Sequence, residues 1–225
     1  MKEYAIIVAG GSGSRMQSEI PKQFLLLAGK PILMHTINAF IHYSKNLSII
    51  LVLPDFAIDQ WTQLCIKYKF NYPLKIVTGG KTRFQSVKNG LDAIHENESL
   101  VAIHDGVRPL IRKEIISASY RLAQIHGCAI AATRLKESLR IVDKDQTRSI
   151  DRSQYRSIQT PQTFQTELIK AAYADCEDST ELTDDASVAE KNGLKISLFE
   201  GSYENIKITT QEDLLFVEAL LREKK

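Results

Sequence analysis

Short apolar runs alternate with longer amphipathic stretches along the first 132 residues of the chain. The apolar runs are nearly continuous, which is typical of strands buried on both faces of a parallel sheet. Between them, apolar residues recur at the three- to four-residue spacing of helices. Strands are predicted at residues 4–9, 47–53, 74–77, 100–103 and 128–132, and helices at 31–40, 61–68, 84–94 and 115–125. This alternation predicts an α/β fold built on a doubly wound, mostly parallel sheet.

The pattern breaks between residues 133 and 157, where charged and apolar residues mix without a long period. We expect a protruding β-arm here, with two short strands on either side of the turn-like Asp143-Lys144-Asp145. After the arm, helices are predicted at 167–174, 185–191 and 211–221, and strands at 195–199 and 205–208. Since the chain shows neither repeats nor a low-complexity linker, we expect residues 1–225 to form a single domain.

Composition and charge narrow the functional classes. The 225 residues are 44% hydrophobic and 25% charged, as in ordinary globular proteins. A net charge of +2 is too small to attract nucleic acid or a membrane by its bulk field, so we expect neither partner. No apolar run approaches the roughly 18 residues that span a bilayer, and no secretory signal precedes the first strand. The 3 cysteines lack metal-ligand spacing, so we expect a reducing, cytoplasmic compartment.

Four polar segments follow directly on predicted strands. They are residues 10–22, 79–86, 104–109 and the stretch around Lys207. In an open α/β sheet, ligands bind beyond the carboxyl ends of the strands. The four segments are therefore expected to contribute to one site.

The first polar segment is rich in glycine and ends in two cations. Glycines let the backbone approach a ligand, and successive amides can cradle phosphate oxygens. The third glycine of a dinucleotide fingerprint is missing, because Met16 stands there, and no Lys-Ser/Thr pair closes a P-loop. Arg15 and Lys22 instead suit a triphosphate whose leaving pyrophosphate must be charge-stabilised. The alternative is an ordinary strand-to-helix turn with solvated basic residues.

Asp105 ends an apolar strand at the carboxyl edge of the predicted sheet. Mg²⁺ prefers one or two carboxylates plus phosphate oxygens, so a carboxylate here is a natural ligand. The alternative is an N-cap for the next helix; the metal role is favoured because a phosphate loop implies a metal. The neighbouring His104 is interpreted as a hydrogen-bonded structural residue rather than a base.

Two further segments carry weaker signals. Gly79-Gly80, followed by Arg83 and Ser86, could line a base or a phosphate, or could form a plain βα turn. Thr183 or Asp184 before a helix indicates an N-cap, and this structural role is favoured over direct catalysis.

Several motifs in a fixed order, from residue 6 to residue 210, together resemble a known family. They are AIIVAGGSGSRM, PKQFL, GKPILMHT, TRFQSV, HDGVRPL, QTPQ, TDDASV and ENIKIT. The chain resembles the 2-C-methyl-D-erythritol 4-phosphate cytidylyltransferases, and the related ribitol-5-phosphate cytidylyltransferases share most of the pattern. The resemblance implies a Rossmann-like fold of the nucleotide-diphospho-sugar transferase type. It also implies a homodimer that uses Mg²⁺ to transfer CMP from CTP to a polyol phosphate, in non-mevalonate isoprenoid biosynthesis.

The resemblance assigns roles to residues by motif match. Arg15 and Lys22 take the catalytic places. The CTP-binding positions are Ala9, Gly10, Gly11, Gly13, Gly80, Arg83, Ser86, Asp105 and Gly106, of which Asp105 is also the metal position. The polyol-phosphate positions are Arg152, Lys207 and Ser138. Residues 133–157 match an arm that embraces the partner subunit, which would place Arg152 in the neighbour's site.

A few residues depart from the family pattern. Glu137-Ser138 stands where an Asp-Thr pair is often found, and Arg140 where a lysine is. Ser138 keeps a hydroxyl and Arg140 a charge, so a role in substrate contact is weakened but not lost. Gly106 and Val107 replace frequent alanines, and Glu204 is a weak candidate for holding metal.

Three alternatives stay open at this point. The acceptor could be ribitol 5-phosphate, since the cationic residues cannot separate two polyol phosphates. An NAD(P)-binding oxidoreductase is disfavoured by the absent third glycine and by the lack of a clear acidic residue ending the second strand. A catalytically silent nucleotide-binding regulator is disfavoured by the intact Arg15, Lys22 and Asp105.

Overall fold

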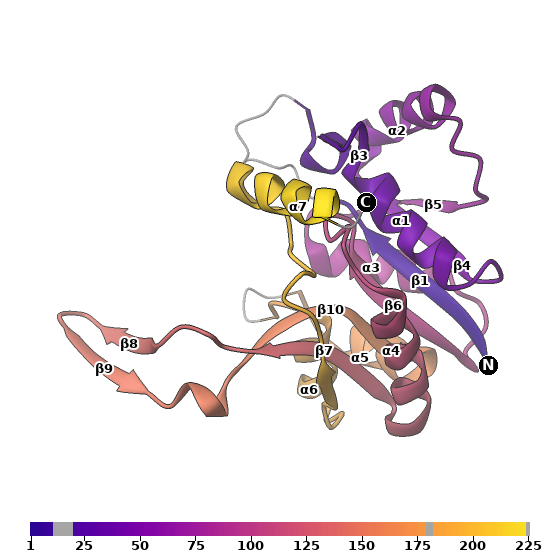
Figure 1. Cartoon of the computed structure of the whole chain (residues 1–225). Helices are drawn as coiled ribbons and strands as arrows, with labels where there is room; N and C mark the ends of the chain where they lie inside the picture. The colour runs from indigo at the N-terminus through magenta and orange to yellow at the C-terminus, as the bar shows by residue number, and fades with distance from the viewer. Residues whose placement is uncertain (11–19, 179–181, 224–225) are drawn as a thin grey trace.

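A seven-stranded sheet runs through the centre of the computed structural model, which describes residues 1–10, 20–178 and 182–223 (Figure 1). The strand order is β11-β7-β10-β6-β1-β4-β5. All neighbouring strands pair in parallel except β10, which is antiparallel to both β6 and β7. The strands are β1 (Lys2–Val8), β4 (Ser48–Leu53), β5 (Lys75–Thr78), β6 (Ser99–Asp105), β7 (Cys128–Arg134), β10 (Arg156–Gln165) and β11 (Leu198–Glu200). The predicted doubly wound, mostly parallel sheet is confirmed.

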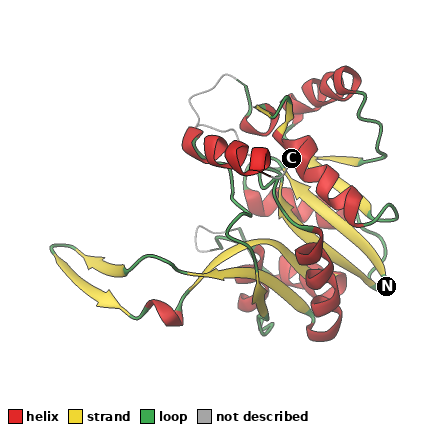
Figure 2. Ribbon diagram, viewed as in Figure 1, coloured by secondary structure: helices red, strands yellow, loops and turns green. Residues whose placement is uncertain are grey.

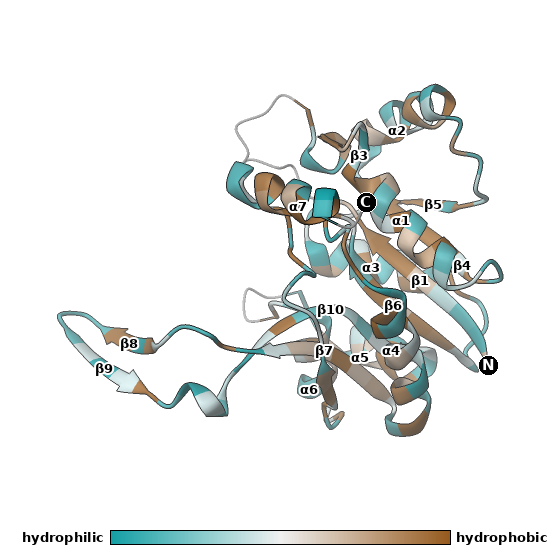
Figure 3. Cartoon of the chain, in the orientation of Figure 1, coloured by the Kyte–Doolittle hydropathy of each residue, from teal (hydrophilic) through white to brown (hydrophobic). Residues whose placement is uncertain are grey.

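Helices cover both faces of the sheet (Figure 2). One face packs against α1 (Ile32–Tyr43), α2 (Asp55–Tyr68) and α4 (Lys113–His126), and the other against α3 (Arg83–Asp92), α5 (Thr166–Asp175) and α6 (Asp185–Lys191). Successive strand residues point to opposite faces. In β1, Ala5 and Ile7 therefore enter the first core while Tyr4 and Ile6 enter the second. This two-sided burial explains the continuous apolar runs of the inner strands, which are coloured brown in Figure 3.

The order of the strands reverses beside β1. The chain passes from β1 through α1 to β4 and β5, and then returns through α3 to β6 on the other side of β1. Val8 and Asp105 are register partners at the carboxyl ends of β1 and β6, and the amide of Gly106 donates to the carbonyl of Val8 at 2.8 Å. Ligands of open α/β sheets bind at such a reversal.

The predicted arm is present and extends well away from the sheet (Figure 1). Strands β8 (Leu139–Asp143) and β9 (Gln146–Ile150) form an antiparallel hairpin, with Lys144 in its turn at a φ of 51°. The short 3₁₀ helix η3 (Arg152–Gln154) then leads into β10. The return path of the arm is therefore continuous with a strand in the middle of the sheet.

One predicted strand in the second half of the chain is wrong, and one strand of the structure is missing from the predictions. Residues 205–208 form no strand; Ile208 is buried in a small apolar cluster with Val217 of α7 (Gln211–Glu223), and its amide donates to Val107 O at 2.9 Å. Strand β10 was not predicted, because Pro161 and several polar residues interrupt any apolar run there. The pairing register of β10 with β7 shifts between Ile158 and Gln162, where a residue lacking an N–H is tolerated.

Most other boundaries lie within a few residues of the predicted ones. The exception is helix α2, which begins six residues before the predicted start, at Asp55. Between β1 and α1, the structure adds the 3₁₀ helix η2 (Lys22–Phe24) and a short hairpin of β2 (Leu26–Leu27) and β3 (Lys30–Pro31). Within the described residues, no helix is long and apolar enough to cross a membrane.

Candidate active site

A cavity of about 420 Å³ lies at the carboxyl ends of the central strands. Its volume is in the ordinary range for a small-molecule site. Eight of the residues singled out in the sequence line it, namely Ala9, Gly10, Lys22, Gly80, Arg83, Ser86, Asp105 and Lys207. Gly106 follows Asp105, and a Cβ at Gly106 would lie 3.0 Å from the Cβ of Ala9. The structure thus brings together four segments that are far apart in the sequence.

The glycine-rich end of the cavity is held by Gln23, the residue after Lys22. Gln23 is buried, and its side-chain amide donates to the carbonyl of Ala9 at 2.9 Å. This contact ties η2 to the end of β1, so that Lys22 reaches the cavity wall. Gly11, Gly13 and Arg15 lie outside the described residues.

The opposite wall is the turn between β5 and α3. Ser86 Oγ accepts from the amide of Gly80 at 3.1 Å and donates to the carbonyl of Thr82 at 2.8 Å. Thr82 in turn caps α3 by accepting from the amide of Gln85. A Cβ at Gly80 would come within 2.3 Å of the Cβ of Gln85, so this position requires glycine. The turn is therefore a preorganised backbone surface.

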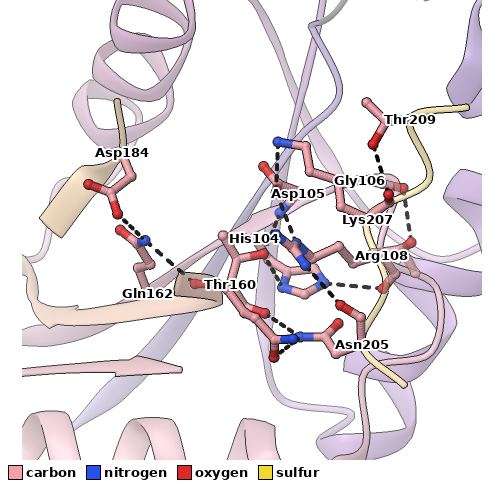
Figure 4. A network of polar contacts seen from close by, with 12 residues as sticks. His104, Asp105, Gly106, Arg108, Thr160, Gln162, Asp184, Asn205, Lys207 and Thr209 are labelled. Atoms are coloured by element: carbon pink, nitrogen blue, oxygen red, sulfur yellow. Dashed lines mark hydrogen bonds and ion pairs between the residues drawn. The ribbon is translucent and has the colours of Figure 1, made fainter. Parts of the chain in front are cut away.

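Asp105 lines the cavity and is surrounded by cations, of which Arg108 and Lys207 are seen in Figure 4. Its Oδ2 lies 3.0 Å from Nε of Arg108 and 3.1 Å from Nζ of Lys207, and its Oδ1 lies 3.9 Å from Nε of Arg83. Burial alone raises the pKa of Asp105, but the charges of the three cations outweigh it and hold that pKa well below its ordinary value. Asp105 is therefore ionised at neutral pH. It is not an N-cap, because α4 begins after Arg112.

A buried polar network supports this cluster from below. Thr160 Oγ1 lies 3.0 Å from Nδ1 of His104 and accepts from the amide of Asp105 at 3.1 Å. The side chain of Asn205 donates through Nδ2 to the backbone carbonyl of Thr160 at 2.7 Å. The backbone carbonyl of Asn205 accepts from Nη1 of Arg108 at 2.8 Å. The network ties β6, β10 and the segment that carries Lys207 into one unit (Figure 4).

His104 has a structural role in this network, as interpreted from the sequence. Its Nε2 lies 3.3 Å from the carbonyl of Arg108, and the ring packs against Phe40 at a centroid distance of 5.0 Å. Burial lowers the pKa of His104 to about 4, so the ring is neutral at physiological pH.

A second cavity of about 240 Å³ adjoins the first. The two cavities share Arg83, Asp105 and Lys207. The other lining residues of the second cavity are mostly polar and come from the turn after β6, from β10 and from the segment before α6; they are Arg108, Ile158, Gln159, Thr160, Gln162, Thr183 and Asp184. Asp184 is the N-cap of α6 in a capping box with Ser187, which confirms the structural role favoured from the sequence.

The described residues do not all converge on these cavities. Ser138 and Arg152 are exposed and belong to the arm, where a guanidinium nitrogen of Arg152 donates to the carbonyl of Lys136. Sequence reasoning missed Arg108, Thr160, Gln162 and Asn205 as parts of the site, although they lie in motifs that carried the family resemblance. It also missed Asp185 as the partner of Arg83, 102 residues away.

Comparisons with known proteins point to one family. Residues 4–223 match the family described as 2-C-methyl-D-erythritol 4-phosphate cytidylyltransferase. The chain belongs to this family. A curated member from Bacteroides thetaiotaomicron is 48% identical over 221 residues, covering 98% of this chain and 100% of the relative. A member from Clostridium novyi is 39% identical, covering 98% of this chain and 96% of the relative.

Solved structures of the family are similar across the whole chain. The 4-diphosphocytidyl-2C-methyl-D-erythritol synthase of Anaerococcus prevotii superposes with a TM-score of 0.83 at 32% identity, covering 98% of each chain. The 2-C-methyl-D-erythritol 4-phosphate cytidylyltransferase of Francisella tularensis superposes with a TM-score of 0.80 at 30% identity, covering 97% and 99% of the two chains. The family fold therefore extends over the protruding arm.

Proposed function

We propose that this protein transfers CMP from CTP to 2-C-methyl-D-erythritol 4-phosphate and releases pyrophosphate, forming 4-diphosphocytidyl-2-C-methyl-D-erythritol. The observation that carries the proposal is the pair of adjoining cavities that share Arg83, Asp105 and Lys207. A transfer between two substrates needs both reacting groups side by side, and this arrangement provides two compartments with a common charged wall.

The larger cavity suits the nucleotide. Backbone at Ala9, Gly10 and Gly80 lines it, and Ser86 fixes the turn that carries Gly80. Lys22 stands at the same wall as the glycine-rich segment and supplies a positive charge for the triphosphate. Arg15 would add a second charge from the adjoining segment.

The smaller cavity suits a phosphorylated polyol. Lys207 and Arg108 provide charge for the acceptor phosphate. Thr160, Gln162 and Asp184 line the same cavity with groups that can hydrogen-bond hydroxyls, as recognition of a polyol requires. Ser138 and Arg152 would reach this compartment only from another subunit, because their arm extends away from the sheet of its own chain (Figure 1).

The chemistry needs positioning and charge rather than a covalent intermediate. An ionised oxygen of the acceptor phosphate attacks the α-phosphorus of CTP and forms the new P–O bond. The bond from the α-phosphorus to the oxygen that bridges it to the β-phosphorus breaks, and pyrophosphate leaves with the electron pair. Lys22 neutralises the charge that develops on the leaving group. A phosphate monoester is largely ionised at neutral pH, so no protein base is required.

The residues present fit Mg²⁺ held mainly by the substrates. Among the described residues, no cluster of three His, Cys, Asp or Glu side chains could hold a metal. Asp105 is an ionised carboxylate on the cavity wall, and its Oδ1 is 3.9 Å from the nearest cation that pairs with it. One carboxylate together with phosphate oxygens is an ordinary donor set for Mg²⁺. When bound there, Mg²⁺ would neutralise charge on the triphosphate.

We also propose a homodimer in which the arms are exchanged. The arm carries exposed apolar side chains, among them Val142 at 69% exposure and Tyr155 at 43%. Exposed apolar groups on a protruding hairpin indicate a surface that another chain covers.

We also propose that the reaction takes place in the cytoplasm. The three cysteines form no disulfide, which supports a reducing compartment.

The proposal is tested by measuring pyrophosphate release with CTP and Mg²⁺. Methylerythritol 4-phosphate and ribitol 5-phosphate are offered separately, with a no-acceptor reaction as the baseline. We expect rapid release with methylerythritol 4-phosphate and far slower release with ribitol 5-phosphate. Release at the baseline rate with both acceptors would overturn the proposal, and faster release with ribitol 5-phosphate would reassign the acceptor. A protein that binds CTP but releases no pyrophosphate in this assay would be a nucleotide-binding regulator. A separate assay that shows no NADH-linked absorbance change would exclude the oxidoreductase.

A further inference from the structure

Arg83 is held by a carboxylate outside both cavity linings. Its Nη1 and Nη2 donate to Oδ1 and Oδ2 of Asp185 at 2.8 and 2.6 Å, a two-pronged contact that fixes the plane of the guanidinium. Asp185 is fully buried, and Tyr173 donates its hydroxyl to the same Oδ1 at 2.7 Å. The Tyr173 ring stacks on Phe84 at a centroid distance of 4.6 Å, which fixes the hydroxyl in turn.

A buried ion pair of this kind is weak evidence for stability, because removing two charges from water offsets their attraction. The ion pair is more informative about where the Arg83 guanidinium is held. Arg83 is the first residue of α3 and Asp185 the first residue of α6, so the contact joins the starts of two helices on one face of the sheet. Burial alone lowers the pKa of Arg83, and the charge of Asp185 more than offsets this, so its guanidinium stays charged.

The guanidinium is also placed where the two cavities meet. Arg83 lines both of them and keeps 29% of its side chain exposed, although Asp185 is buried. The two other shared residues, Asp105 and Lys207, pair with each other at 3.1 Å. Arg83 stands 3.9 Å from the free side of that carboxylate and has its own counter-ion in Asp185. It is therefore a cation held in place independently of Asp105.

We propose that Arg83 binds the acceptor phosphate at the junction of the two cavities, and that Asp185 and Tyr173 are positioning residues for it. This role differs from the CTP-binding position that the family resemblance assigned to Arg83. The inference rests on the proposed function, because it takes the smaller cavity as the acceptor compartment. Without Asp185, the guanidinium would be drawn toward Asp105, and the acceptor phosphate would lose a fixed partner.

The test is a double-mutant cycle on steady-state kinetics, with each substrate varied while the other saturates. For Asp185→Asn and for Arg83→Ala, we expect the KM of the acceptor to rise about tenfold or more, while the KM of CTP stays within about twofold. In the Arg83→Ala background, adding Asp185→Asn should leave the acceptor KM unchanged, because Asp185 acts through Arg83. Partial unfolding lowers the amount of active enzyme and moves neither KM, so the pattern separates positioning from a structural role.

Two further variants keep the test decisive. If Asp185→Asn does not fold, Tyr173→Phe removes a single hydrogen bond to Asp185 and should raise the acceptor KM about threefold. Val188→Ala is the matched control, because Val188 is a buried apolar residue of α6 that lines neither cavity; both its KM values should equal those of the wild type. An unchanged acceptor KM in Asp185→Asn, or in Tyr173→Phe where the former does not fold, would overturn the inference. So would an additive double mutant.

Failure of this inference and failure of the proposed function are distinguishable. A wild-type protein that releases no pyrophosphate with either polyol phosphate contradicts the proposed function. An active wild type whose variants change only the KM of CTP contradicts the inference alone, and returns Arg83 to the nucleotide side.

Discussion

The charged residues of the Asp105 cluster are paired and at least partly buried, whereas those of the arm are exposed. Asp105 is buried, and its contacts to Arg108 and Lys207 lie within the same chain. Arg152 is exposed on a segment that extends away from the sheet (Figure 1). The position of each group in the cluster is set by burial and by several hydrogen bonds. In the proposed homodimer, the partner subunit that covers the arm would set the position of Arg152. The comparison teaches that one chain fixes the Asp105 cluster by itself, whereas the arm would need the proposed partner to hold its charged residue in place.

The largest expected effect is in the body of the chain, at Lys22. Lys22→Ala should lower kcat about 100-fold, equivalent to roughly 3 kcal/mol, because a cation facing the leaving pyrophosphate is removed. The measurement is pyrophosphate release at saturating substrates. Lys30→Ala is the matched control, since Lys30 is exposed on β3 and lines neither cavity. A Lys22→Ala enzyme with near-normal turnover would remove Lys22 from the mechanism.

The next expected effect is the change with pH in the free energy of unfolding, which His104 of the buried network should cause and the arm should not. The pKa of His104 is about 4 in the folded chain and about 6.5 when unfolded, so between these values the unfolded chain binds more protons. Stability is therefore complete above pH 6.5 and is lost as the pH falls toward 4. We expect the free energy of unfolding to drop by about 2 kcal/mol between pH 7.5 and 5 from this residue alone.

Urea unfolding of the wild type and of His104→Gln at each pH isolates this contribution. The variant should be less stable at pH 7.5 but should lose less stability on acidification. Equal losses in the two proteins would mean that His104 titrates normally, and that the network under Asp105 is open to protons. Shortening the β8–β9 hairpin should leave the pH dependence unchanged.

The smallest effect is expected at the arm. Arg152→Ala should raise the KM of the acceptor about tenfold, with the KM of CTP unchanged and the free energy of unfolding altered by less than about 0.5 kcal/mol. Arg148→Ala on the neighbouring strand β9 is the control, because Arg148 is an exposed cation of the same hairpin with no proposed contact. If both variants behave alike, the arm contributes charge in general and Arg152 has no specific role.

The sequence predicts the inner sheet well because burial on both faces leaves a direct trace. The runs that became β1, β4 and β6 are apolar at nearly every position. The arm is equally visible, because an exposed hairpin has neither core period. An N-cap at Thr183 or Asp184 follows from local chemistry, and the structure shows that it is Asp184.

Strand β10 could not be predicted because its burial depends on distant partners. Gln162 and Thr163 are buried polar residues whose side chains are satisfied by hydrogen bonds. Gln162 donates to Asp184, and Thr163 donates to Ser119 Oγ at 2.9 Å. Without those partners the same residues are characteristic of an exposed loop. The pairing of Arg83 with Asp185 is hidden for the same reason, since the packing of α3 against α5, and of α5 against α6, brings the two together.

Mixed dimers test most directly the central claim that the body of one subunit and the arm of another form one site. The Lys22→Ala homodimer and the Arg152→Ala homodimer are each expected to be poorly active. In a mixed dimer, one site combines an intact Lys22 with an intact Arg152 from the partner, while the other site lacks both. After random exchange of subunits, we predict about a quarter of the wild-type rate of pyrophosphate release at limiting acceptor. A rate that stays at the average of the two parents, with mixed dimers demonstrably present, would contradict arm exchange.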